Sequence, residues 1–137
     1  ENDKLLNKKI KFYQSKRIIN YIEFRENIKF IIKKASVVVL PTYYREGVPR
    51  VLIEAMSMYK PIITTKTPGC KDTLIDGVNG YFVKTKSSKD LVEKILKISS
   101  NRANWKKMGY ASRKLVKKRF DANIIANKIV KYLNDKI

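Results

Sequence analysis

The chain has 137 residues, 44% of them hydrophobic. This length and composition are those of one compact domain with a hydrophobic core. It contains no His and a single cysteine, Cys70, so a His-based catalytic triad, a zinc site and an internal disulfide are excluded. No apolar run approaches the ~18 residues that span a bilayer, and residues 1–30 lack the pattern of a signal peptide. We therefore expect a cytoplasmic protein with one domain over residues 1–137.

Positive charge dominates the composition and is concentrated towards the C-terminus. Lys and Arg number 31 against 12 Asp and Glu, for a formal charge of +19. Residues 81–137 hold 16 of these cations, whereas residues 41–80 are nearly neutral. Two interpretations stay open: the charge is a solvated surface, or its C-terminal part contacts an anionic partner such as a lipid headgroup or a nucleic acid.

The first forty residues combine helical and extended patterns. Apolar residues near helical spacing predict a helix over residues 2–12, and the β-branched run at 18–22 predicts a strand. Residues 28–35 carry apolar side chains at i, i+3, i+4 and i+7, which is typical of a helix resting on a sheet. The unbroken apolar run Val37–Leu40, ended by Pro41, predicts a strand buried on both faces.

The remaining residues continue the alternation and then become helical. Pro49 suits the first turn of a helix that carries Leu52, Ala55, Met56 and Tyr59, and the run 62–65 predicts the next strand. A loop, a helical turn at 72–75 and a tight turn at 76–80 lead to a brief strand at 81–83. Three helices follow, with N-caps expected at Ser87, Asn101 and Asp121.

This order of elements predicts an α/β fold, a partial doubly wound parallel sheet of the Rossmann-like kind with helices on both faces. Four strands are few for that design, so we expect the opening strands to lie in sequence that precedes these residues. In open parallel sheets, ligands bind beyond the carboxyl ends of the strands. The site should therefore be sought in the loops after residues 22, 40, 65 and 83.

The loop after Leu40 carries two carboxylates, Glu46 and Glu54, separated by seven residues. Gly47 lets the backbone approach a ligand, and the amides at the start of the following helix form a positive end that suits phosphate. A carboxylate can accept two hydroxyl hydrogen bonds, so the pair could hold a sugar and a ribose on either side of a diphosphate. The alternative is purely structural, with Glu46 exposed and Glu54 paired with Arg50 at i, i+4.

The wider string of motifs resembles a known family. It consists of Pro-Thr after a strand, Glu46-Gly-Val-Pro-Arg-x3-Glu54-Ala-Met, Lys60-Pro-Ile-Ile-Thr, Gly69-Cys and Asp76-Gly-Val-Asn-Gly-Tyr-Phe-Val. This ordered set is similar to the C-terminal, donor-binding half of retaining GT-B glycosyltransferases of family 4 (group 1), especially bacterial enzymes of capsule and O-antigen synthesis. The resemblance covers about residues 17–134.

The resemblance implies roles for individual residues. Glu46 and Glu54 match the family's Glu-x7-Glu motif, so Glu46 is the expected catalytic residue at the donor sugar and Glu54 the expected ribose ligand. Glu23 stands where the family usually has Gly, which shifts the expected base contacts to the backbone around Arg25. We add Arg50 on the phosphate side. The complete set expected to bind the donor is Arg25, Thr42, Glu46, Gly47, Val48, Arg50, Glu54 and Gly69.

The resemblance also implies a reaction. A hexose would pass from a nucleotide diphosphate sugar, expected to be a UDP-sugar, to a saccharide or lipid-linked saccharide acceptor, with retained anomeric configuration. Fixed cations and helix-end amides would stabilise the leaving diphosphate, so neither a metal nor another cofactor is required. Family members take further phosphate ligands and most acceptor contacts from sequence upstream, so we expect these residues alone to be inactive.

A basic binding module without catalysis is the alternative function. The expected helix at 103–120 carries seven cations that could bind anionic lipid or nucleic acid. No nucleic-acid reader motif is present, so nucleic acid is not an expected partner. An anionic membrane surface remains a candidate partner, because a transferase that builds lipid-linked saccharides works at the inner face of the cell membrane.

Overall fold

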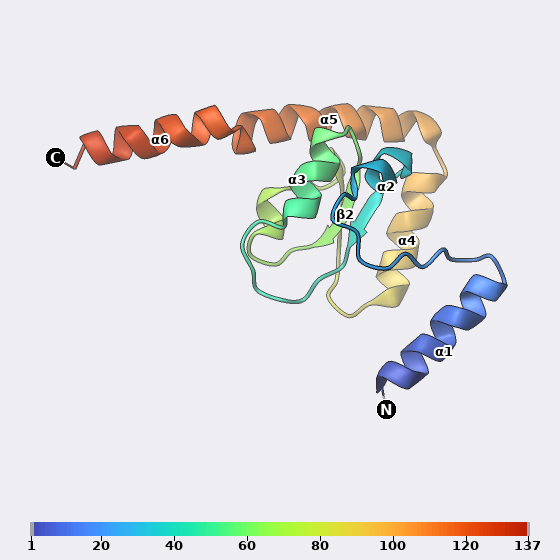
Figure 1. The fold of residues 1–137 in the computed structure, drawn as a ribbon. Helices are drawn as coiled ribbons and strands as arrows, with labels where there is room; N and C mark the ends of the chain where they lie inside the picture. Colours follow the sequence, from blue (N-terminus) through green and yellow to red (C-terminus); the bar gives the residue numbers. More distant parts are fainter. Residues whose placement is uncertain (1, 137) are drawn as a thin grey trace.

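Three parallel strands form the centre of the fold in the computed structural model, which describes residues 2–136 (Figure 1). Their order is β1 (Val38–Leu40), β2 (Ile62–Thr65) and β3 (Gly80–Val83). Val38 pairs with Ile62 and Ile62 pairs with Gly80, so the three strands start at one level and end at the same edge. The strands predicted around residues 37–40, 62–65 and 81–83 are confirmed.

Helices occupy most of the remaining chain. They are α1 (Asn2–Ser15), α2 (Lys29–Lys34), α3 (Arg50–Ser57), the short 3-10 turn η1 (Cys70–Asp72), α4 (Ser88–Ser99), α5 (Arg102–Phe120) and α6 (Ala122–Asn134). The side chains of Ser87, Asn101 and Asp121 accept hydrogen bonds from backbone N–H groups in the first turns of α4, α5 and α6. All three predicted N-caps are therefore confirmed.

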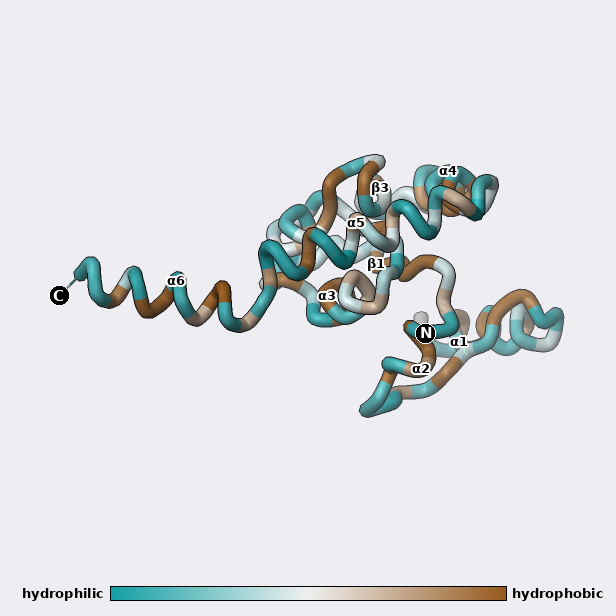
Figure 2. The backbone as a smooth tube through the Cα atoms, turned by 90° about the horizontal axis from the view of Figure 1, so that it is seen from above, coloured by the Kyte–Doolittle hydropathy of each residue, from teal (hydrophilic) through white to brown (hydrophobic). Residues whose placement is uncertain are grey.

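The core has two halves because neighbouring residues of a strand point to opposite faces of the sheet. Ile62 packs with α2, α3, η1 and the C-terminal half of α5, whereas Ile63 packs with α4 and the N-terminal half of α5. Figure 2 shows the strands between these helical layers. The α/β prediction with helices on both faces is thus confirmed.

The strand predicted at residues 18–22 is wrong. Residues 18–27 form an exposed connection between α1 and α2 without regular structure. A β-branched run becomes a strand only when its backbone groups find partners in a neighbouring strand, and this run lies along none of the three strands. Residues 37–40 are half-buried instead of buried on both faces, because β1 pairs only with β2 among the described residues.

Smaller differences occur at the ends of elements. Pro49 is the N-cap of α3 instead of a residue of its first turn. That helix ends at Ser57, so Tyr59 lies beyond it with a φ of 59°. The helical turn predicted at 72–75 lies at Cys70–Asp72. Helix ends depend on local hydrogen bonds that periodicity does not resolve.

Two helices extend away from the sheet (Figure 1). The long helix α5 continues into α6, which turns only slightly at Asp121 and has no buried residue. The other, α1, is exposed along nearly all of its length. None of the described helices is both long and apolar enough to cross a membrane.

The turn before β3 is fastened by a buried side chain, Asn79. Its Oδ1 accepts a hydrogen bond from the Ile75 N–H at 2.7 Å, and its Nδ2 donates to the Thr73 carbonyl at 3.0 Å and to the Ser112 hydroxyl of α5 at 3.5 Å. The backbone carbonyl of Asn79 accepts from Ile62. Asn79 thus joins the turn to the sheet and to α5.

We expect Asn79→Ala to lower the free energy of unfolding by about 2–4 kcal/mol, because it leaves the Ile75 N–H and the buried Thr73 carbonyl without their partner and opens a small cavity. Urea unfolding followed by circular dichroism measures the change. Asn123→Ala, at an exposed position of α6, is the matched control and should stay within about 0.5 kcal/mol of the parent. Equal effects of the two substitutions would contradict the structural role of Asn79.

Candidate functional site

The loops that follow the three strands gather at the carboxyl edge of the sheet. The Thr64 hydroxyl donates to the Leu40 carbonyl at 2.9 Å, and the Thr65 hydroxyl donates to the carbonyl of Thr42. Both bonds tie the end of β2 to the start of the loop after β1. The hydrogen bond to its backbone carbonyl therefore holds Thr42 in position. The hydroxyl group of Thr42 accepts a further hydrogen bond from the N–H of Tyr44 at 3.2 Å.

Gly69 lies directly against Glu46 and Gly47. A Cβ atom at Gly69 would come within 2.3 Å of the Gly47 carbonyl oxygen and 2.7 Å of the Glu46 carbonyl oxygen. Gly69 also has a φ of 80°, in the region that favours glycine. The two loops can approach this closely only because residue 69 has no side chain. The structure thus brings three of the expected donor-binding residues, Glu46, Gly47 and Gly69, together.

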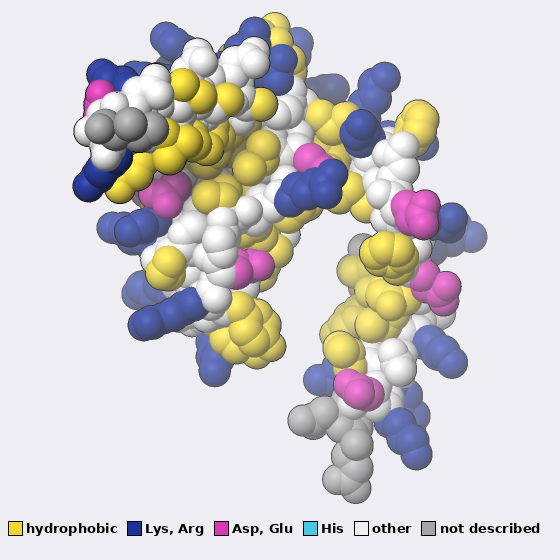
Figure 3. Space-filling model, turned by 60° about the vertical axis from the view of Figure 1, so that its left-hand side comes forward, with side chains coloured by type: hydrophobic (Ala, Val, Ile, Leu, Met, Phe, Trp, Pro, Cys, Tyr) yellow, Lys and Arg dark blue, Asp and Glu magenta, His cyan; other side chains and the backbone are white. Residues whose placement is uncertain are grey.

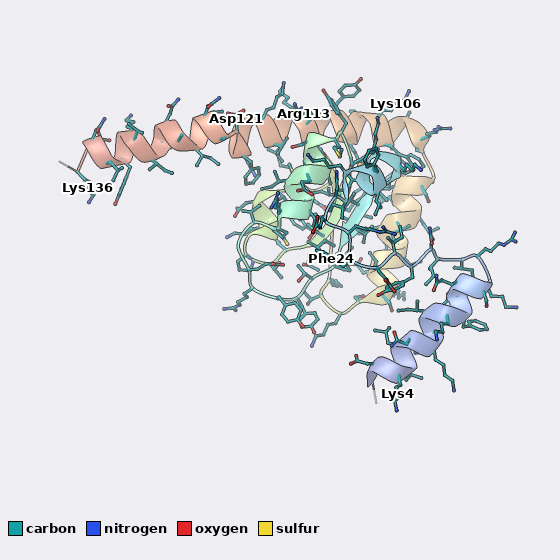
Figure 4. The ribbon with its side chains drawn as sticks, viewed as in Figure 1. Lys4, Phe24, Lys106, Arg113, Asp121 and Lys136 are labelled. Atoms are coloured by element: carbon teal, nitrogen blue, oxygen red, sulfur yellow. The ribbon has the colours of Figure 1, made fainter. Side chains whose placement is uncertain are left out.

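A second part of the site lies at the start of α3. Arg50 Nε and Glu54 Oε1 form an i, i+4 ion pair at 3.3 Å, with 92% and 26% of the side chains exposed. Both residues line an open hollow of about 680 Å³ whose other wall is the segment before α2. That wall includes Arg25 and the almost fully exposed Phe24, labelled in Figure 4. Arg25, Arg50 and Glu54 therefore share one surface.

The two carboxylates of the motif have different surroundings. Glu46 is exposed and does not line the hollow, whereas Glu54 lines it and contacts Arg50. In this arrangement Glu46 is exposed and Glu54 is paired with Arg50, as the structural alternative predicted. Because the Arg50 side chain is open to water, this ion pair contributes only about 0–1 kcal/mol, so a ligand can replace Arg50 as the partner of Glu54 at little cost. Val48 is half-buried beside Pro49, which caps α3.

Two exposed tyrosines in the same loop were not singled out from the sequence. The rings of Tyr43 and Tyr44 stack with centroids 4.4 Å apart, and their hydroxyl groups share a hydrogen bond of 3.1 Å. This hydrogen bond, followed by repulsion from Tyr43, raises the pKa of Tyr44 above its usual value of 10.0. Two adjacent aromatic residues, two and three positions before Glu46, were the available signal.

The basic helix considered for anionic partners is α5. Its cations are mostly exposed, and its opposite face is buried against the sheet and α3 through Met108, Ser112, Leu115 and Val116. Figure 3 shows Lys and Arg side chains spread over the visible face, with apolar patches between them. Among residues 2–136, no group of three or more His, Cys, Asp or Glu side chains could hold a metal ion.

Residues 1–115 match the family described as "Glycosyl transferases group 1". The chain belongs to this family. It is 37% identical over 90 residues to the capsular polysaccharide biosynthesis glycosyltransferase CapM of Staphylococcus aureus, covering 66% of this chain and 23% of CapM. The fold agrees with this family, because it matches GT-B glycosyltransferase domains.

Two further similarities extend the comparison. The chain is 30% identical over 114 residues to the Campylobacter jejuni N,N'-diacetylbacillosaminyl-diphospho-undecaprenol alpha-1,3-N-acetylgalactosaminyltransferase, covering 82% of this chain and 30% of that enzyme. The crystal structure of Anabaena HepE in complex with UDP-glucose superposes with a TM-score of 0.84 at 23% identity, over 98% of this chain and 38% of HepE. The chain thus spans between about a quarter and two fifths of these relatives.

We expect Gly69→Ala to destabilise the contact between the two loops, because the added Cβ meets the Gly47 carbonyl and the backbone conformation becomes strained. Gly77→Ala is the matched control, since Gly77 has a similar φ of 72° and open space around it. The control should cost about 1 kcal/mol in the free energy of unfolding and Gly69→Ala about 1–3 kcal/mol more, measured by urea unfolding. Equal costs would show that the close approach is unimportant.

Proposed function

We propose that this chain is the nucleotide-sugar-binding part of a retaining glycosyltransferase of family 4. The enzyme would transfer a hexose from a UDP-sugar to a saccharide or lipid-linked saccharide during surface polysaccharide synthesis. It would work in the cytoplasm, beside the inner face of the cell membrane. The observation that carries the proposal is the surface shared by Arg25, Arg50 and Glu54 at the start of α3, beside the joined loops of Gly47 and Gly69. The UDP-glucose complex of HepE and the lipid-linked substrate in the name of the Campylobacter relative support the choice of donor and acceptor.

The nucleotide would occupy the hollow. Glu54 would exchange its contact with Arg50 for two hydroxyl groups of the ribose, since one carboxylate can accept both hydrogen bonds. The released guanidinium of Arg50 would then face the diphosphate, which matches its planar set of donors. Arg25, on the opposite wall, would contact the base or a phosphate of the nucleotide.

The sugar would lie over the joined loops. Glu46 is exposed there and can accept hydrogen bonds from hydroxyl groups of the hexose. The backbone at Gly47 and Val48 would approach the sugar or diphosphate. Gly69 has no side chain, so the surface formed by the two loops stays open there. Thr42 would fix the position of the loop through its link to β2.

The chemistry needs a stabilised leaving group. The bond between the anomeric carbon and the diphosphate oxygen breaks, and UDP leaves with the electron pair. The acceptor hydroxyl forms the new bond on the same face of the sugar and gives its proton to the departing diphosphate oxygen. Arg50 and the amides at the start of α3 would stabilise the charge that develops on the diphosphate. We propose that these groups suffice without a metal or another cofactor.

We expect the 137-residue chain to bind UDP, and Glu54→Gln to weaken this binding at least about tenfold, because hydrogen bonds to a charged carboxylate are lost. Glu46→Gln should leave UDP binding unchanged and weaken binding of UDP-glucose alone. Titration calorimetry measures both ligands. Glu93→Gln, on the exposed face of α4, is the matched control and should change neither affinity. Equal UDP binding by the parent and Glu54→Gln would rule out the ribose contact.

We also propose that transfer requires residues beyond these 137, because the curated relatives named above are about three to four times longer than the matched part. The expected result is no transfer of radiolabelled hexose from UDP-glucose by this chain, with or without a saccharide acceptor. Binding of UDP to the same preparation shows that the chain is folded and competent. Turnover by this chain would overturn the proposal.

A further inference from the structure

The Tyr43–Tyr44 pair is a preformed aromatic surface at the carboxyl edge of the sheet. The side chains are neighbours in sequence, yet their rings lie 28° from parallel with centroids 4.4 Å apart. The two residues remain 51% and 64% exposed. Folding thus leaves both rings largely in water, although each could bury apolar area elsewhere.

Contacts from two other elements position this pair. The Lys86 ammonium, in the loop after β3, lies 4.8 Å from the centroid of the Tyr43 ring. The Tyr44 N–H donates to the Thr42 hydroxyl, whose residue is itself joined to β2. Tyr43 therefore packs against both Lys86 and Tyr44, and the more exposed ring is that of Tyr44. A ligand would find this surface already ordered, which reduces the entropy lost on binding.

The pair lies apart from the hollow assigned to the nucleotide. That hollow is bounded by residues 20–31 and the start of α3, and neither tyrosine lines it. Tyr43 instead contacts Lys86 in the loop after β3, the strand at the far side of the sheet from β1. Glu46 follows Tyr44 by two residues, in the loop that connects the two regions. A molecule resting on Tyr44 would therefore lie near the proposed donor sugar but outside the proposed nucleotide site.

We propose that Tyr43 and Tyr44 form a platform for a pyranose ring of the acceptor saccharide. A pyranose has an apolar face of C–H groups, which carry partial positive charge and match the electron-rich face of an aromatic ring. Its hydroxyl groups point outwards at the rim, where water and the phenol oxygens can reach them. The inference rests on the proposed function, because it supplies the second substrate for the donor bound beside Glu46.

The experiment is saturation-transfer NMR on the 137-residue chain with UDP at saturation. The probes are four methyl β-pyranosides, those of glucose, galactose, N-acetylglucosamine and N-acetylgalactosamine. At least one probe should receive saturation through its ring C–H protons. Replacing both tyrosines by Leu should weaken its binding about tenfold, whereas replacing both by Phe should preserve it, since Phe keeps the aromatic faces.

A matched control pair lies at the opposite edge of the sheet. Tyr59 and Tyr110 are exposed, contact each other edge to face at 5.4 Å, and have the Arg113 guanidinium 5.8 Å from the Tyr59 ring. Replacing both of these tyrosines by Leu should leave pyranoside binding unchanged. Glu46→Gln should also preserve it, because the proposed platform is separate from the donor-sugar contact.

Each contrary result has a distinct meaning. Loss of the pyranoside signal in Glu46→Gln, with retention in the Leu variant of Tyr43 and Tyr44, would place the sugar in the donor site and overturn the platform. Weaker UDP binding in that Leu variant would indicate stacking on the base, which also overturns it. No signal from any of the four probes with the parent chain would do the same. Absence of UDP binding by the parent would instead contradict the proposed function.

Discussion

The buried central strand β2 is the constraint on which the rest of the structure depends. All four of its residues are inaccessible to solvent, and it pairs in parallel with β1 on one side and β3 on the other. Its two threonines cannot leave their hydroxyl groups unpaired at such depth, and they donate to a carbonyl at the end of β1 and to one in the loop that follows. These side-chain bonds hold the loop that carries Glu46 at the edge where the other strand-end loops emerge. The core and the placement of the site thus come from the same four residues.

The candidate site combines a tightly packed backbone with a weak ion pair at its surface. Below it, Gly47 and Gly69 are in close backbone contact, and Pro49 is buried where it caps α3. Above it, Glu54 is half-buried and its ion-pair partner Arg50 is exposed to water. This combination suits a group that must exchange one partner for another, because ligand contacts can form without disturbing the core.

Much of the fold could be predicted from the sequence because local rules agree with tertiary packing over residues 37–121. The apolar runs of β1 and β2, the stripe of α3 and the three polar N-caps each gave a correct element. Residues 18–22 show where such reasoning fails, since strand propensity is realised only beside a partner strand. The apolar run also led to an overestimate of the burial of β1, because the sequence of a strand does not determine how many strands lie beside it.

The candidate site was predictable in outline. The positions of the loops in the sequence predicted that Glu46, Gly47 and Gly69 lie at one edge of the sheet. The close backbone contacts between these residues agree with that prediction. Spacing could not decide whether Glu54 faces a ligand or Arg50. The i, i+4 spacing of Arg50 and Glu54 allows an ion pair between them, and it equally allows Glu54 to contact a ligand. The stacking of Tyr43 and Tyr44 also escaped prediction, since it depends on side-chain conformation and on Lys86 from a distant loop.

The unpaired side of β1 has a consequence for handling the chain in solution. Along Val38–Leu40, backbone donors and acceptors on that side have no strand beside them within the described residues. Such an edge is a template on which a strand of another molecule can add. The formal charge of +19 keeps copies apart by repulsion, and this repulsion weakens as ionic strength rises. We therefore expect dilute salt to favour the monomer of these 137 residues, and concentrated salt to promote association of copies through this edge.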